Sequence, residues 1–258
     1  MWWSINLLVT MFIVQSLGAQ SHKTKLLYQL GKVKIYAFEE NKSEFSNAIL
    51  YIDTFILKHD STEILVNFGF KNYKLGVQSS VDSSNLCANS GDGQHIHFIH
   101  DKDPYTALYT GAHKYKASPG HHVFLAFLSR SYHLSLKHKK SYLIHEYNGG
   151  AGKDDFNEKK PHLFYSRPKG TYVGKDTAQI LIDYYLINCE LSPKGYKVKV
   201  KIDDKYELIT EEWTPLIVEG LNIGEHNLEL TLIDKKGRPI NNQYNKSKRK
   251  FILAMNPK

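Results

Sequence analysis

Short stretches in which apolar and polar side chains alternate recur along the chain, and they are rich in Val, Ile, Tyr and Phe. Gly, Pro, Asn and Asp bound these stretches, and no long segment keeps a helical period. The pattern therefore predicts an all-β protein. At 258 residues the chain is long enough for two domains, each with its own core.

Three segments of the first half have counterparts, in the same order, in the second half. They pair residues 65–75 with 181–191, residues 93–98 with 195–200, and residues 119–126 with 223–230. Such self-similarity indicates a duplicated unit. The sequence thus predicts two tandem immunoglobulin-like β-sandwich domains, residues 20–150 and 151–258, joined at a polar, Gly-rich stretch.

The second repeat predicts which face of the first is buried. Residues 197–202 alternate Lys with Val and Ile, and unpaired lysines are almost never buried, so the lysines face outward. By correspondence His95 and His97 face outward, whereas His100 faces inward. On the strand expected beside them, the outward positions include Val123 and Leu125, which require a cover. That cover is the other domain, residues 26–38, or a ligand.

The N-terminal residues have the pattern of a secretory signal peptide. An apolar stretch runs from Ile5 to Leu17 and small residues follow at Gly18 and Ala19, which predicts cleavage near Gly18–Gln20 and a signal peptide of residues 1–19. No second apolar run is long enough to span a membrane. We therefore expect export to the periplasm, the cell surface or the medium. The sequence does not specify an oligomeric state.

The two cysteines and the net charge bear on a possible disulfide and on whether the protein binds nucleic acid. An oxidising compartment permits a Cys87–Cys189 disulfide, but Cys189 replaces an aromatic residue of the repeat, which favours two unpaired cysteines. The net charge is +8, yet 34 basic residues are interleaved with 26 acidic ones. This distribution, together with export, argues against a nucleic-acid partner.

Histidines concentrate in the first domain, where nine of the thirteen fall between His95 and His145. His122 aligns with His226 of the other repeat and is interpreted as structural. Two histidines at i and i+2, such as His95 and His97, project from one strand face and can reach a single metal ion. A third ligand is expected from the remaining candidates, which are His133, His113 and His121. Imidazole ligands suit copper or zinc. The alternative is a His-rich exposed sheet edge that binds no metal.

Two other functions compete with metal binding. The first is recognition of a glycan, a phosphopeptide or another anion, for which the expected residues are Tyr105, Phe127, Arg130, Arg167 and Lys169. The second is a purely structural role at the cell surface. An enzyme is not expected, because the chain has no Gly-x-Ser-x-Gly elbow, no zinc-protease helix motif and no recognisable nucleophilic cysteine.

Residues 93–101, with Pro119-Gly120-His121-His122 and Tyr132-His133, form a Gly-x-His-x-His, Pro-Gly-x-His and late-histidine pattern. It resembles His-rich β domains of unknown function in exported bacterial proteins, over about residues 60–146. Residues 161–176 also resemble secreted Bacteroidetes proteins, some of which are labelled phosphopeptide-binding. The resemblance implies a β fold and an exported protein, without a settled activity.

Overall fold

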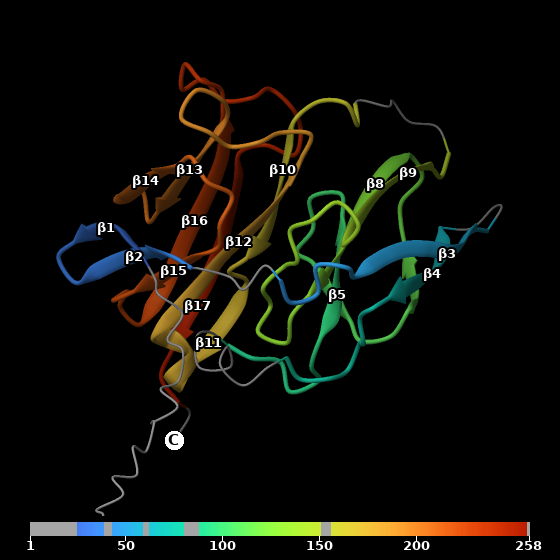
Figure 1. The fold of residues 1–258 in the computed structure, drawn as a ribbon, viewed down its shortest axis with the longest axis horizontal. Coiled ribbons are helices and arrows are strands. Elements are labelled where there is room, and N and C mark those ends of the chain that lie inside the picture. The colour runs from blue at the N-terminus through green and yellow to red at the C-terminus, as the bar shows by residue number, and fades with distance from the viewer. Residues whose placement is uncertain (1–24, 39–42, 59–61, 80–87, 151–155, 257–258) are drawn as a thin grey trace, which may run out of the picture.

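The computed structural model describes residues 25–38, 43–58, 62–79, 88–150 and 156–256. In these residues four β-sheets form two sandwiches that lie side by side (Figure 1). The predicted all-β, two-sandwich fold is confirmed. No helix among the described residues has the length and apolar character needed to cross a membrane. The predicted signal peptide and Cys87 lie outside the described residues.

The first sandwich packs a three-stranded sheet against a four-stranded one. The first sheet has the order β3 (Ile49–Leu57), β4 (Glu63–Lys71), β7 (Ala112–Lys116). The second has the order β6 (Thr106–Leu108), β5 (His95–His100), β8 (His121–Ser129), β9 (Tyr142–Asn148). Their inner faces share one apolar core, in which Phe68, Phe98 and Phe124 contact one another.

The second sandwich contains two five-stranded sheets. One has the order β1 (Lys25–Leu30), β2 (Val33–Ala37), β15 (Leu216–Glu219), β12 (Gln179–Ile187), β10 (His162–Arg167). The other has the order β11 (Gly170–Val173), β17 (Ser247–Ala254), β16 (Gly224–Ile233), β13 (Lys197–Ile202), β14 (Tyr206–Thr210). A single turn of 3-10 helix, Gly174–Thr177, follows β11.

The N-terminal strands belong to the second sandwich. The sequence groups residues 25–37 with the first domain, but β2 pairs antiparallel with β15, and Val33 and Ile35 are buried in the second core. These two strands complete a sheet whose other members come from the C-terminal half. Each end of the chain therefore contributes to the same sandwich.

The two repeats share individual hydrogen bonds at equivalent histidines. His122 Nδ1 lies 2.7 Å from an Asp101 carboxyl oxygen and its Nε2 lies 2.8 Å from the Ser118 carbonyl. His226 makes the same contacts with Asp203 and the Asn222 carbonyl, at 2.7 and 2.8 Å. In both repeats each ring nitrogen thus lies within hydrogen-bond distance of an equivalent oxygen atom. This matches the structural role inferred for the aligned histidines.

The second sandwich covers the outer face of the first. Val123, Leu125 and Phe127 are fully buried, and Phe127 stacks on Tyr185 of β12 with ring centroids 4.7 Å apart. Phe164 of β10 belongs to the same apolar cluster. Of the three covers considered for this face, the structure places the other sandwich there, because both apposed sheet faces are apolar and bury each other.

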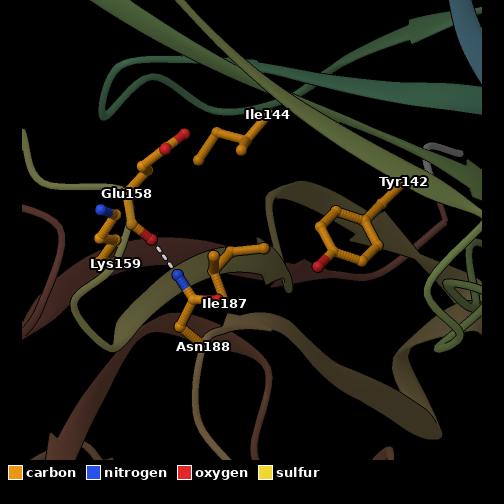
Figure 2. A pocket seen from close by; sticks show the side chains of 6 residues that line it. All are labelled: Tyr142, Ile144, Glu158, Lys159, Ile187 and Asn188. Atoms are coloured by element: carbon orange, nitrogen blue, oxygen red, sulfur yellow. Dashed lines mark hydrogen bonds between the residues drawn. The ribbon is translucent and has the colours of Figure 1, made fainter.

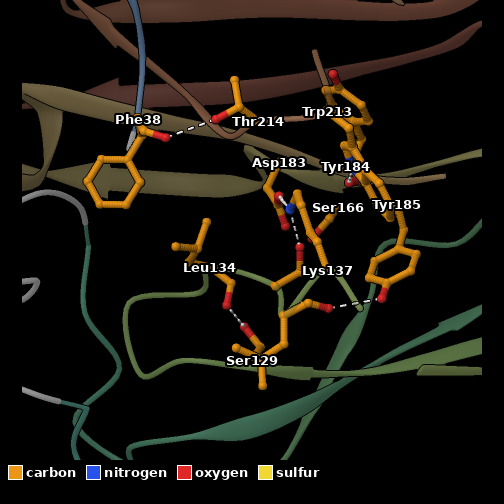
Figure 3. A network of polar contacts seen from close by, with 12 residues as sticks. Phe38, Ser129, Leu134, Lys137, Ser166, Asp183, Tyr184, Tyr185, Trp213 and Thr214 are labelled. Atoms are coloured by element: carbon orange, nitrogen blue, oxygen red, sulfur yellow. Dashed lines mark hydrogen bonds and ion pairs between the residues drawn. The ribbon is translucent and has the colours of Figure 1, made fainter. Parts of the chain in front are cut away.

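A buried ion pair also joins the two sandwiches (Figure 3). Lys137, in the segment between β8 and β9, pairs with Asp183 of β12 and also donates to Ser135. The Asp183 side chain is 0% exposed, and its Oδ2 has no hydrogen-bond partner. Nearby, the Tyr185 hydroxyl donates to the Leu136 carbonyl at 2.9 Å. These contacts fix the segment that follows His133 against the second sandwich.

Candidate functional site

His95 and His97 occupy alternate positions of β5 and share its outward face, as their alternation predicts. They are not surface residues, however: both are 0% exposed. The second sandwich closes over this face, and Ser166 of β10 lies 3.1 Å from His97 Nδ1. The expectation of exposed histidines is therefore corrected by the docking of the two sandwiches.

A tight turn after β8 brings the third histidine to the pair. The Arg130 amide donates to the Leu134 carbonyl and the His133 amide donates to the Arg130 carbonyl, both at 2.9 Å. His133 adopts a left-handed backbone conformation with φ of 67°. Its Nδ1 thereby lies 3.0 Å from His95 Nε2, which is itself 2.9 Å from His97 Nε2. One ligand nitrogen from each of the three rings lies within 4.8 Å of the others.

His113 does not join this cluster. It lies on β7 of the opposite sheet, and its ring packs against Phe98 at 4.8 Å and Tyr115 at 5.3 Å. Phe98 faces the first core, whereas its neighbour His97 faces the second sandwich. Strand β5 thus separates His113 from the cluster, which removes it from the candidate ligands. His121, also considered, pairs instead with Glu146 at 3.1 Å.

Groups around the cluster hold two of the rings in place. His95 Nδ1 lies 2.8 Å from the Gly93 carbonyl, and the Tyr105 ring stacks on His97 with centroids 3.6 Å apart and planes 10° apart.

Ser166 was not recognised from the sequence as a residue of this cluster, because it comes from the other repeat. The only signal for it was its place in the segment that resembles secreted Bacteroidetes proteins.

The cluster is buried, and the cationic side chains of Arg167 and Lys169 lie near it. Burial lowers the pKa of His95 to about 4 and holds the pKa of His97 and His133 well below the usual range. The cations Arg167 and Lys169 lower all three further. At neutral pH the three imidazoles are therefore uncharged, which is the form that binds metals.

This burial makes the metal-free protein sensitive to acid. Between about pH 6.5 and the lower folded-state pKa of about 4, the unfolded state binds protons that folded His95 does not. The free energy of unfolding therefore falls as the pH decreases through this window, by about 1.4 kcal/mol per pH unit for each such histidine. We expect urea unfolding of chelator-treated protein to show this loss. The His95→Asn/His97→Asn variant should lose less, and equal slopes for the two proteins would contradict the prediction.

A second group, His100, Asp101 and His122, is also compact enough to hold an ion. Its contacts differ, because both ring nitrogens of His122 already contact oxygen atoms of Asp101 and Ser118, and His100 Nε2 lies 2.7 Å from the Tyr147 hydroxyl. The other repeat keeps the same His–Asp pair with Ile202 in place of His100. This group is therefore better explained as a structural element of the fold.

The residues expected for glycan or anion recognition do not form an open surface. Tyr105, Phe127 and Arg130 are at most 2% exposed, and Arg167 is 7% exposed. Arg130 pairs with Glu44 and lies 5.0 Å from the Phe45 ring. Only Lys169 is partly exposed. The apolar face that was to carry such a ligand is the interface between the sandwiches.

A separate pocket of about 520 Å³ opens at the edge of this interface (Figure 2). Its walls come from both sandwiches and consist of Tyr142, Ile144, Glu158, Lys159, Ile187 and Asn188. None of the three clustered histidines lines it. The histidine cluster is thus enclosed by packed side chains rather than placed in this pocket.

Comparison with known proteins adds little to this geometry. No family model and no curated protein matches the chain. Among solved structures, fibronectin(III)-like modules of Clostridium thermocellum CbhA are similar at 13% identity and a TM-score of 0.29, covering 80% of this chain and 95% of that one. The Bacteroides ovatus glucan-utilization protein SGBP-B, solved with a mixed-linkage heptasaccharide, is similar at 6% identity and a TM-score of 0.23, covering 80% and 70%. Likenesses this low carry no argument about function, and the fold assignment rests on the sheets themselves.

Proposed function

We propose that this protein is an exported, non-enzymatic binding protein that holds one transition-metal ion, copper or zinc, on His95, His97 and His133. The proposal rests on the convergence of three uncharged imidazoles at the buried interface. Imidazole nitrogen is the ligand type that both metals accept. The first sandwich supplies all three ligands, and the second sandwich closes over them.

The hydrogen-bonding roles available to the three rings support this proposal. A carbonyl can only accept, so His95 Nδ1 donates to Gly93 and a neutral His95 presents one lone pair at Nε2. His97 Nε2 and His133 Nδ1 both lie about 3 Å from that atom. Hydrogen bonds among the three rings would require this one lone pair to accept from two N–H groups, unless His133 Nδ1 accepts instead from the Tyr105 hydroxyl 3.3 Å away. A metal ion removes this conflict, because each ring then contributes a lone pair.

Two of the three nitrogen–nitrogen distances, those from His95 Nε2 to His97 Nε2 and to His133 Nδ1, agree with such a site, and the third pair lies within 4.8 Å. At metal–nitrogen bonds of about 2.0–2.1 Å, ligand atoms about 90–110° apart are separated by about 2.8–3.4 Å. The Gly93 carbonyl accepts from His95 Nδ1, and the Ser166 hydroxyl lies 3.1 Å from His97 Nδ1, where it can accept the proton of a ring that binds the ion through Nε2. Ligating histidines usually donate their other N–H to such groups. The positive charges of Arg167 and Lys169 act against the ion and lower its affinity.

Calorimetric titration of Cu²⁺ and Zn²⁺ into chelator-stripped protein tests the proposal. We expect one ion per chain, and affinity at least about 100-fold weaker in the His95→Asn/His97→Asn variant. Asparagine keeps a donor at the Nδ1 position but has no group at Nε2, so the bonds to Gly93 and Ser166 are retained. His113→Asn is the matched control and should bind like wild type. Equal affinity of wild type and the double variant for Cu²⁺ and Zn²⁺ would contradict the proposal.

A further inference from the structure

Three cations gather where the β10–β11 turn meets β17. Gly170 of β11 pairs with Phe251 of β17, and the side chains of Lys169 and Arg249, which precede these positions, both donate to backbone carbonyls of residues 102–105. The Lys169 ammonium lies 3.9 Å from the centroid of the Tyr105 ring, and the Arg167 guanidinium lies 5.5 Å from the same ring. Arg249 lies 5.1 Å from the Tyr165 ring. Residues of both sandwiches thus surround these charges.

Backbone carbonyls are the main acceptors for two of these cations. Lys169 Nζ donates to the Tyr105 carbonyl at 2.6 Å, and Arg249 Nη2 donates to the carbonyls of Lys102 and Asp103 at 2.6 and 3.1 Å. The Arg249 Nε is buried and has no hydrogen-bond partner. Within the described part of the chain, neither Lys169 nor Arg249 forms an ion pair with a carboxylate.

The neighbouring lysines of β17 behave differently. Lys248 pairs with Asp204 at 3.0 Å, and Lys250 pairs with Glu225 at 2.7 Å. Because successive residues of a strand face opposite ways, these two lysines lie on the other side from Arg249. The outer face of β17 therefore has its charges matched, whereas the face toward Lys169 collects positive charge.

Partly buried like charges are costly without a counter-charge. The pKa of Lys169 reflects this cost: burial lowers it to about 8, and Arg167 and Arg249 add to the effect. A multiply charged anion would offset it. Arginine and lysine N–H groups form their strongest hydrogen bonds with carboxylate or phosphate oxygens.

We infer that Lys169 and Arg249, with the charge of Arg167 nearby, bind an oxyanion of the phosphate class at the junction of the two sandwiches. This site is separate from the three clustered histidines. The ligand is a phosphate group, either free or carried on a phosphorylated protein segment.

Thermal unfolding and calorimetry of chelator-treated protein test this site, with inorganic phosphate compared against chloride at equal ionic strength. We expect phosphate to raise the unfolding temperature of wild type. Lys169→Met and Arg249→Met should bind phosphate more than tenfold more weakly. Lys169→Met should also unfold at a higher temperature than wild type in chloride, because it removes a partly buried positive charge that forms no ion pair within the described residues. Lys248→Met removes the same charge from the opposite face and should leave phosphate binding unchanged.

A phosphoserine peptide and its unphosphorylated form provide the second arm. Tighter binding of the phosphopeptide than of inorganic phosphate would identify a phosphorylated segment as the ligand, and equal affinity would identify the free ion. The inference is overturned if neither ligand binds beyond the chloride control, or if Lys248→Met weakens binding as much as Lys169→Met. Because a chelator is present throughout, either outcome is independent of the metal site.

Discussion

Replacing Lys137 with methionine is expected to lower the free energy of unfolding by about 3–5 kcal/mol, because the Asp183 carboxyl group would stay fully buried without its ion-pair partner. The cost comes from the unpaired carboxyl group rather than from lost packing, since methionine preserves most of the side-chain volume. Urea unfolding measures the change. We expect the Lys137→Met/Asp183→Leu variant, which removes both charges, to recover much of the loss.

The matched control is an exposed ion pair of the first sandwich. Lys58 pairs with Glu63, but the lysine side chain is 57% exposed. Lys58→Met should therefore change stability by less than about 1 kcal/mol. A loss below that limit for Lys137→Met as well would show that the buried pair does not hold the sandwiches together.

If His95, His97 and His133 hold the proposed ion, removing it is expected to destabilise the protein by about 4 kcal/mol when the free ion stands at about 1,000 times its dissociation constant. The reason is linkage: the three ligands come together only in the folded chain, so the ion stabilises that state alone. Thermal unfolding with added copper or zinc and then with a chelator measures the difference. The His95→Asn/His97→Asn variant should show the same unfolding temperature in both conditions. A change in unfolding temperature of similar size in that variant would show that the ion binds away from His95 and His97.

The sequence by itself determined the all-β fold, the repeat and the strand faces. Alternation forces the lysines of residues 197–202 outward, and the repeat transfers that assignment to His95 and His97. The aligned His122 and His226 make matching hydrogen bonds, as expected of a shared structural residue. These inferences succeeded because side-chain direction along a strand follows from local geometry alone.

Only the tertiary structure decided how the two sandwiches meet. Burial of His95 and His97 depends on β10 and β12, which lie far away in the sequence, and the strand pairing of β2 with β15 joins segments about 180 residues apart. The choice of His133 over His113 depends on a left-handed turn and on which sheet each occupies. Alternation assigns a residue to a face, but contacts between distant segments decide what covers that face. The outward histidines predicted by the repeat are therefore interface residues, enclosed with Ser166 and Tyr105.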